Sequence, residues 1–89
     1  AAYIDWESLY ADLHAGDFLE LVREGDNPHD KFAIMVTDES GNKMGYIPRF
    51  ENKALARQLD EGIQTCAVVL QVKKTSRVWQ LYIEVFLRG

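Results

Sequence analysis

Large apolar residues occupy every second position near the end of this chain, and such alternation predicts β-strands. The clearest stretch is residues 78–87, where one face would carry Trp79, Leu81, Ile83, Val85 and Leu87. The polar residues between them would fall on the opposite face. Residues 63–74 form the longest strand signal, with an apolar centre. We therefore expect Leu70 and Ile83 to lie in the core.

Four shorter stretches also predict strands, at residues 1–4, 17–24, 32–37 and 43–47. The last two are separated by the turn-forming residues 38–42, so we expect them to pair as a hairpin. Gly45 inside the second strand of this hairpin predicts a bulge or a close backbone approach. Pro48 should end the strand, because proline has no N–H group to donate to a sheet.

Two short helices are predicted as well. Asp5 is a candidate N-cap, and apolar residues follow it at the spacing of one helical face, so we expect a helix over residues 5–13. A second helix is expected over residues 51–61, with Leu55 and Leu59 facing the core. A glycine follows each segment and is a common helix stop.

Six short strands with long connections are typical of a small barrel. The predicted fold is therefore mainly β: a small closed or nearly closed antiparallel barrel of about six strands, with two short helices. Eighty-nine residues are enough for one domain, covering residues 1–89.

The charge is unevenly distributed along the chain. Residues 1–30 hold eight acidic residues and one basic residue, whereas residues 31–89 hold six acidic and nine basic residues. The two parts thus carry −7 and +3, within a formal net charge of −4. Such asymmetry can leave a basic face on an acidic protein, or simply an uneven solvated surface.

The chemistry-bearing residues do not predict an enzyme. The single cysteine, Cys66, lies within an apolar strand signal, so we expect it to be inert core; it also fits a reducing cytoplasm. His29 and Asp30 are sequence neighbours that should point to opposite sides. Cysteine and histidine lack metal-ligand spacing, and no glycine-rich phosphate loop occurs. We expect no cofactor, and no apolar run is long enough to cross a membrane.

One stretch, residues 23–50, combines a turn-forming loop with the predicted hairpin, which is a common way to present a binding site. Its residues resemble the HIRAN domain, a small β-rich module of DNA-repair helicases and short bacterial proteins. The similarity is good over residues 17–62 and loose on both flanks. The matching residues are Arg23, Glu24, Asn27, Pro28, His29, Asp30, Ala33, Ile34, Val36 and residues 45–49, followed by Leu55, Ala56, Leu59, Asp60 and Gly62.

The resemblance implies a six-stranded, partly open antiparallel β-barrel of the OB or SH3-like kind, which binds single-stranded DNA and recognises its free 3′ end. It places the carboxylate of Asp30 against the terminal sugar. An ionised carboxylate accepts a hydrogen bond from a 3′-hydroxyl and repels a 3′-phosphate. One group could therefore both select a free 3′ end and reject a phosphate-blocked one. The structural alternative is a turn aspartate that accepts backbone N–H groups or pairs with Arg23. The two roles are compatible.

Basic residues near this loop are candidates for phosphate contacts. The resemblance places Arg49 against a phosphate, with help from Arg23 or Lys31; otherwise Arg49 is a solvated arginine near a helix start. Lys73, Lys74 and Arg77 form a basic turn that could steer phosphates or be merely solvated.

Three aromatic or heteroaromatic residues are candidates for base stacking. His29 stands where the family usually has tyrosine, and an imidazole offers less stacking area. Tyr3 falls where the family carries an aromatic facing the DNA end. Trp79 matches an aromatic on the last hairpin only approximately, and its alternation favours core. Asn27 either shapes the turn or touches the ligand.

These observations predict a noncatalytic, cytoplasmic module that binds single-stranded DNA or DNA 3′ ends. Its other partner would be a helicase or nuclease domain in a larger protein. The acidic net charge and the histidine in place of tyrosine favour an alternative, a protein–protein interaction module on the same scaffold. A third reading is a family member that has kept the fold and lost the ligand.

Overall fold

The computed structural model describes residues 2–6, 13–74 and 79–88, with residues 2–6 and 88 described by their backbone. This part of the chain contains six strands and one helix. In chain order they are β1 (Ala2–Trp6), β2 (Phe18–Arg23), β3 (Ile34–Thr37), β4 (Lys43–Tyr46), α1 (Arg49–Asp60), β5 (Gln64–Lys74) and β6 (Trp79–Arg88). The predicted mainly β fold is confirmed.

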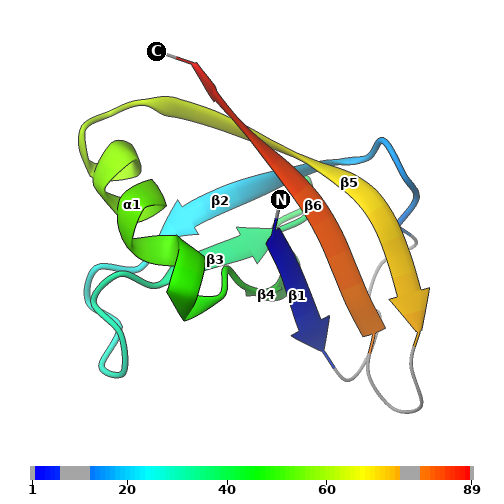
Figure 1. The fold of residues 1–89 in the computed structure, drawn as a ribbon, viewed down its shortest axis with the longest axis horizontal. Coiled ribbons are helices and arrows are strands. Elements are labelled where there is room, and N and C mark those ends of the chain that lie inside the picture. The colour runs from blue at the N-terminus through cyan, green and yellow to red at the C-terminus, as the bar shows by residue number, and fades with distance from the viewer. Residues whose placement is uncertain (1, 7–12, 75–78, 89) are drawn as a thin grey trace.

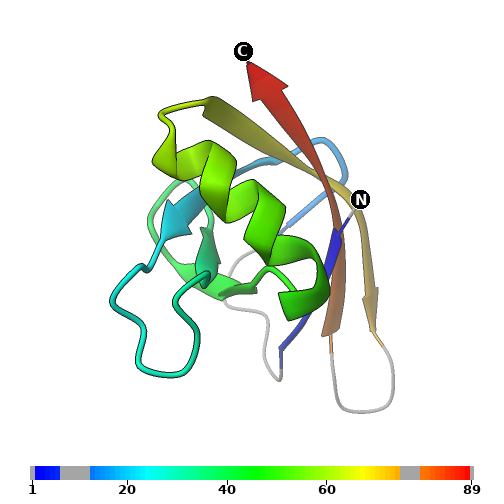
Figure 2. The same ribbon diagram turned by 60° about the vertical axis from the view of Figure 1, so that its left-hand side comes forward.

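All six strands belong to one antiparallel sheet with the order β1-β6-β5-β2-β3-β4. The sheet curls so that its two edge strands, β1 and β4, approach each other, which gives a partly open barrel (Figure 1). Helix α1 connects β4 to β5 and lies beside the loop between β2 and β3 (Figure 2). No helix within the described ranges is long and apolar enough to cross a membrane.

The core lies inside this curl. It is formed by Leu19, Ile34, Val36, Met44, Ile47, Ala56, Ala67, Val69, Leu81 and Ile83. Ile83 is fully buried, as predicted, and so is Leu81 two positions earlier on β6. Leu55 and Leu59 of α1 pack against this cluster, which confirms the predicted face of the helix.

The prediction that Leu70 lies in the core is wrong, because its side chain is 45% exposed. In the β5–β6 ladder Val69 pairs with Ile83 and Gln71 pairs with Tyr82, so Leu70 is the extra residue of a bulge. A bulge shifts the inward and outward positions by one residue. Leu70 follows the buried Val69, so strand alternation already turns it outward, and the bulge makes Val72 rather than Gln71 the next residue that packs against the core.

Cys66 was also expected in the core, yet it is exposed. Its neighbour Ala67 is buried, and successive side chains of a strand point to opposite faces. Cys66 therefore lies on the outer face of the sheet, opposite Phe86 of β6. An apolar run alone does not indicate which of its members face inward.

The chain start differs from the predicted helix. Asp5 and Trp6 belong to β1, where they pair with Gln80 and Trp79 of β6. Asp5 is thus part of a strand rather than a helix cap, because the long β6 offers a partner to each of its residues. Residues 7–12 of the predicted helix lie outside the described part of the chain.

Helix α1 begins two residues earlier than predicted, directly after Pro48. It ends in a Schellman motif: the N–H of Gly62 donates to the carbonyl of Leu59, and the N–H of Ile63 donates to that of Gln58. Gly62 has φ of +84°, which glycine adopts without strain.

The hairpin of β3 and β4 contains the predicted irregularity. Val36 pairs with Gly45 and Thr37 pairs with Lys43, so the register shifts at this point. The shift bends β4 at this point. Pairing continues as far as Ile47, whose N–H donates to the carbonyl of Ile34 at 3.0 Å, and Pro48 then leads directly into α1.

Candidate nucleic-acid interface

Each end of β3 carries a turn built around an Asp or Asn side chain. At the end that follows β3, Asp38 accepts hydrogen bonds at Oδ1 from the N–H groups of Ser40 (2.9 Å) and Asn42 (2.8 Å). Its Oδ2 accepts from the Asn42 side chain at 2.9 Å. Burial raises the pKa of Asp38, but hydrogen bonds from Asn42, Ser40 and Gly41 together outweigh it and lower the pKa.

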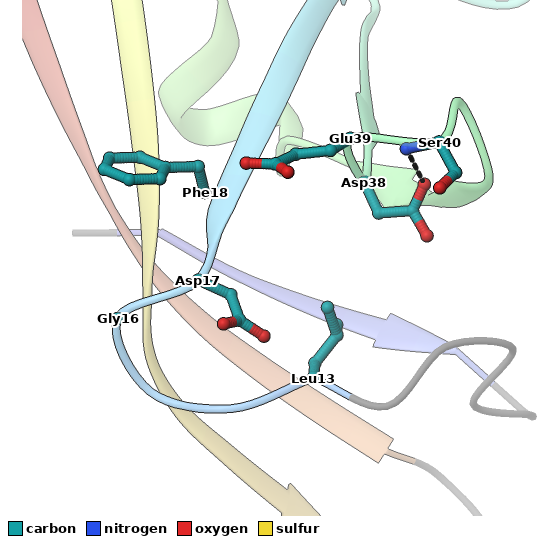
Figure 3. A pocket seen from close by; sticks show the side chains of 7 residues that line it. All are labelled: Leu13, Gly16, Asp17, Phe18, Asp38, Glu39 and Ser40. Atoms are coloured by element: carbon teal, nitrogen blue, oxygen red, sulfur yellow. Dashed lines mark hydrogen bonds between the residues drawn. The ribbon is translucent and has the colours of Figure 1, made fainter.

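This turn borders a hollow of about 450 Å³ on the side of Leu13, Gly16 and Phe18 (Figure 3). Its polar lining is acidic, with Asp17 on one side and Asp38 and Glu39 on the other. A negative lining repels phosphate groups, so this hollow does not fit a nucleic acid. Within the described residues, no group of His, Cys, Asp and Glu side chains could hold a metal ion.

At the other end of β3, residues 24–33 form a loop closed by backbone hydrogen bonds. The N–H of Glu24 donates to the carbonyl of Ala33 at 2.9 Å, and the N–H of Ala33 donates to that of Asp30 at 3.1 Å. Asn27 shapes the tip, because its Oδ1 accepts from the N–H groups of His29 (2.8 Å) and Asp30 (3.1 Å). Asn27 thus has the turn-forming contacts expected of its residue type.

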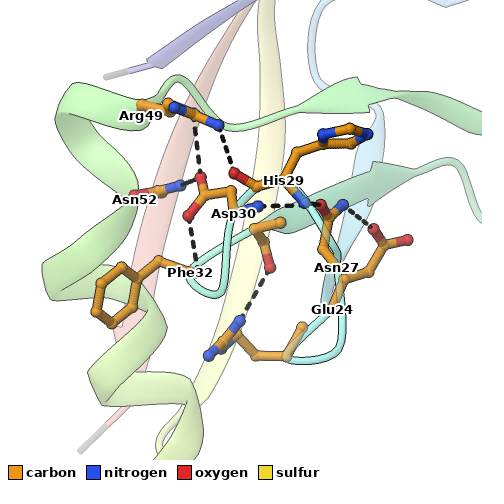
Figure 4. Close-up of polar contacts among 9 residues, drawn as sticks. Glu24, Asn27, His29, Asp30, Phe32, Arg49 and Asn52 are labelled. Carbon is orange, nitrogen blue, oxygen red and sulfur yellow. Dashed lines mark hydrogen bonds and ion pairs between the residues drawn. The ribbon is translucent and has the colours of Figure 1, made fainter.

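Asp30 lies between this loop and helix α1 (Figure 4). Its Oδ1 accepts from the N–H of Phe32 at 2.9 Å, and its Oδ2 accepts from Nδ2 of Asn52 at 2.8 Å. The Phe32 hydrogen bond, followed by that of Asn52 and the charges of Arg49 and Arg23, outweighs burial and lowers the pKa of Asp30. Asp30 is therefore ionised at neutral pH.

Arg49, the first residue of α1, lies against the same loop. Its Nη2 donates to the carbonyl of His29 at 2.6 Å, and its Nε lies 3.6 Å from Oδ2 of Asp30. The Arg49 side chain is nonetheless 73% exposed, whereas that of Asp30 is only 18% exposed. A cation thus covers a sheltered carboxylate and still faces solvent.

The structural alternative for Asp30 included an ion pair with Arg23, but Arg23 pairs with Asp60 instead. Its Nε and Nη2 donate to the two carboxylate oxygens of Asp60 at 3.0 and 3.2 Å, and its Nη1 donates to the carbonyl of Ala33. This fork ties β2 to the end of α1. Most of the donors of Arg23 are therefore engaged within the protein.

Two further candidates lie elsewhere. Trp79 is half-buried at the start of β6, with Nζ of Lys74 at 5.3 Å from its ring centroid. Figures 1 and 2 both place the start of β6 well away from the loop of residues 24–33. Tyr3 pairs with Tyr82 in the β1–β6 ladder, and its side chain lies outside the description. Residues 75–78 of the basic turn also lie outside it.

The loop and α1 together enclose a hollow of about 320 Å³, which we call the first hollow. Its lining includes Asn27, His29, Asp30, Tyr46, Arg49 and Asn52, together with the apolar Ala33 and Ile47. Four of the predicted site residues, Asn27, His29, Asp30 and Arg49, thus meet in one place. Lys31 lies next to it on the same loop and is exposed.

Sequence reasoning missed Tyr46 and Asn52. The Tyr46 hydroxyl donates to Oε1 of Glu24 at 2.8 Å, which is the main cause of the lowered pKa of Glu24. Tyr46 lies within the matching residues 45–49, so it could have been included. Asn52 is buried inside a helix, where asparagine is a poor helix former. An asparagine in the middle of a predicted helix was therefore the available sequence signal that its side chain has a specific hydrogen-bond partner.

The fold and the loop define a small curled β-barrel that presents a hollow with apolar walls and a few polar groups beside its one described helix. Residues 2–87 match the family model of the HIRAN domain, and the chain belongs to this family.

Two solved structures share the fold. A protein from Lactobacillus plantarum matches with a TM-score of 0.74 and 24% identity, over 100% of this chain and 94% of that one. The HIRAN domain of human HLTF matches with a TM-score of 0.74 and 25% identity, over 92% of this chain and 69% of that one. No curated protein matches this chain.

Proposed function

We propose that this HIRAN domain is a noncatalytic module that binds single-stranded DNA at a free 3′-hydroxyl end. HIRAN domains are generally DNA-binding modules. The observation that carries the finer proposal is the pairing of Asp30 and Arg49 in the first hollow. A sheltered, ionised acceptor and an exposed cation lie side by side, and a strand end offers a hydroxyl donor beside a phosphate.

Asp30 retains acceptor capacity for a ligand. A carboxylate has about four lone-pair positions, two on each oxygen. Oδ2 faces Asn52 and Arg49, whereas Oδ1 accepts one hydrogen bond, from Phe32. One position on Oδ1 is therefore left for a hydroxyl. A 3′-phosphate would remove the donor and bring like charges together.

Arg49 supplies the matching phosphate contact. A guanidinium has five N–H donors, of which the His29 carbonyl takes one and Asp30 attracts another. The exposed side chain keeps the others for phosphate oxygens. Lys31 is exposed on the same loop and can assist, while the engagement of Arg23 with Asp60 argues for a structural role of Arg23.

The walls of the first hollow fit a nucleoside. Tyr46 and His29 offer ring surfaces, and Ala33 and Ile47 offer apolar contact. Asn27 holds the loop in shape by its two backbone contacts. Tyr3 and Trp79 lie on β1 and β6, so a stacking role for them would require a strand that continues past this hollow.

The test is a titration with short labelled single strands that end in a 3′-hydroxyl or a 3′-phosphate. The wild-type domain should bind the hydroxyl end more tightly, by about tenfold, the equivalent of about 1.4 kcal/mol. Asp30→Ala should lose this preference and keep part of the phosphate-driven affinity. Asp26→Ala, in the same loop and exposed, is the matched control and should behave as wild type.

A strand with a blocked 5′ end should bind as well as the unmodified strand. Circular dichroism must show that each variant is folded. Equal affinity of the folded wild type for both 3′ ends would sink the end-binding role and leave Asp30 a structural residue of the loop.

One observation favours the alternative of a protein-binding module. Phe18 and Phe86 are more than half exposed on the outer face of the sheet, where they border a hollow with Cys66 and Val68. Exposed aromatic residues of this size are common in protein interfaces. Substituting Phe18 and Phe86 by serine should leave DNA binding unchanged if the two surfaces are independent.

A further inference from the structure

A second hollow, of about 400 Å³, lies next to the first and shares four of its residues, His29, Asp30, Arg49 and Asn52. Its other lining residues are Lys31, Phe32 and Lys53. Figure 4 shows the rings of His29 and Phe32 on opposite sides of Asp30. The Asp30–Arg49 pair therefore forms the boundary between the two hollows.

The second hollow is rich in cations. Nζ of Lys31 lies 5.2 Å and Nζ of Lys53 lies 5.6 Å from the centroid of the Phe32 ring. Both lysines are exposed, and among the residues that the structure describes neither forms an ion pair. Arg49 adds a third cation at the boundary. The one carboxylate of the lining, Asp30, is already engaged by Phe32, Asn52 and Arg49.

The two hollows thus differ in the ligand chemistry they suit. The first has aromatic and apolar walls, which suit a nucleoside. In the second, two ammonium groups lie within the range of cation–π attraction to the Phe32 ring, so this ring holds cations rather than offering itself to a base. Three cations around one engaged carboxylate suit an anion, and on a chain of net charge −4 this concentration stands out.

We infer that the second hollow is a phosphate subsite, in which Lys53 and Lys31 bind a backbone phosphate of the strand on the 5′ side of the 3′-terminal nucleoside. This inference rests on the proposed function, because it takes the same single strand as ligand. The strand would leave the first hollow over Arg49 and continue past Phe32 along the first turns of α1. Lys53 is then a binding residue that contacts no base, so its contribution is independent of sequence.

The test replaces single phosphates of the strand by uncharged methylphosphonates, one position at a time from the 3′ end, and measures binding by fluorescence anisotropy. In the wild type, neutralising one internal phosphate should weaken binding. With Lys53→Ala that same replacement should have little further effect, because the contact is already absent. The matched control is Arg57→Ala, which removes an exposed cation from the last turn of the same helix.

Salt dependence gives a second readout. Each phosphate contact to a single strand contributes about −0.7 to the slope of log K against log salt, so Lys53→Ala should flatten the slope by about that amount. Between about 50 and 200 mM salt, the wild type should then lose about two- to threefold more affinity than Lys53→Ala. Arg57→Ala should keep the wild-type slope.

The outcomes separate the two proposals. If the 3′-hydroxyl preference is present but Lys53→Ala shows the wild-type slope and methylphosphonate profile, the subsite is wrong and the end-binding function stands. If the end preference is absent but the coupling between Lys53 and one phosphate remains, the subsite stands and end recognition fails. If no strand binds to the folded domain, both are overturned.

Discussion

The two ends of β3 carry turns made by the same local chemistry but with different consequences. After the strand, Asp38 is engaged entirely within its own turn, by Ser40 and Asn42. Before the strand, Asn27 holds the turn of the loop, because its side chain accepts from the backbone N–H groups there. Asp30 is thereby free to contact a different element, through Asn52 and Arg49 of α1. A turn aspartate becomes available for binding when another side chain holds the turn.

The electrostatic surroundings separate the two turns further. The described residues around Asp38 include Asp17 and Glu39, and the hollow beside them is acidic. Around Asp30 lie Arg49, Lys31 and Lys53. Both carboxyls have a lowered pKa, but only that of Asp30 owes part of its shift to cations. A lowered pKa alone therefore does not identify the binding carboxylate.

The largest expected contrast is in binding. Asp30→Ala should abolish the preference for a 3′-hydroxyl end, a loss of about tenfold in affinity for that end. Asp38→Ala removes a carboxylate of the same turn chemistry, so it should destabilise the β3–β4 turn and leave the end preference of the folded domain intact. Anisotropy titrations alongside thermal melts check both. A loss of the preference in Asp38→Ala would break the comparison.

The next contrast is in stability, through the amide partners of the two carboxylates. Asn52 is buried and links α1 to the loop, whereas Asn42 is exposed and contacts Asp38 locally. Asn52→Ala should lower the thermal midpoint by about 6 °C or more, because it removes a tertiary hydrogen bond to a charged group, worth about 1.5–3 kcal/mol, and about 1 kcal/mol corresponds to about 4–8 °C in a domain of this size. Asn42→Ala should lower it less. Equal shifts would mean that the loop is not anchored through α1.

The sequence predicted these elements well where the information is local. The apolar pattern and the turn residues placed all six strands within two residues of their observed bounds, and Gly62 marked the end of α1. Leu70 could not be predicted, because residues 67–70 are all apolar and the sequence alone does not show which of them face inward. Asp5 likewise reads as a helix cap until β6 is known to pair with it.

The residues of the candidate site also divide into those that the local sequence identifies and those that depend on tertiary contacts. Asn27, His29 and Asp30 lie in one short loop, and Arg49 follows the next hairpin, so one contiguous motif identified them. Asn52 and Lys53 join only when α1 docks beside the loop. Conversely, Arg23 had the right charge and position in the sequence, but Asp60 on the far end of the helix engages it.

A smaller effect is expected from removing Arg49, the cation that lies beside Asp30 at the start of β3. Arg49→Ala should weaken binding of all sequences alike and flatten the slope of log K against log salt by about 0.7, one phosphate contact. Arg49→Lys keeps the charge but not the planar fork, so it should restore most of the slope and less of the affinity. A slope unchanged by Arg49→Ala would show that its exposed donors do not reach a phosphate.

The smallest expected effect is on the two carboxyl pKa values themselves. Both are lower in the folded chain, so each carboxyl contributes stability above its unfolded pKa, and the contribution disappears as the pH falls through the folded pKa. Added salt screens charges but not short hydrogen bonds. Salt should therefore raise the pKa of Asp30, which faces Arg49, and leave that of Asp38 nearly unchanged, because its donors are uncharged. Carboxyl titration by NMR at low and high salt measures this directly, with Arg49→Ala as the control that should remove the salt sensitivity of Asp30. If both carboxyls respond equally to salt, the distinction between a turn closed on itself and a turn open to a cation does not hold.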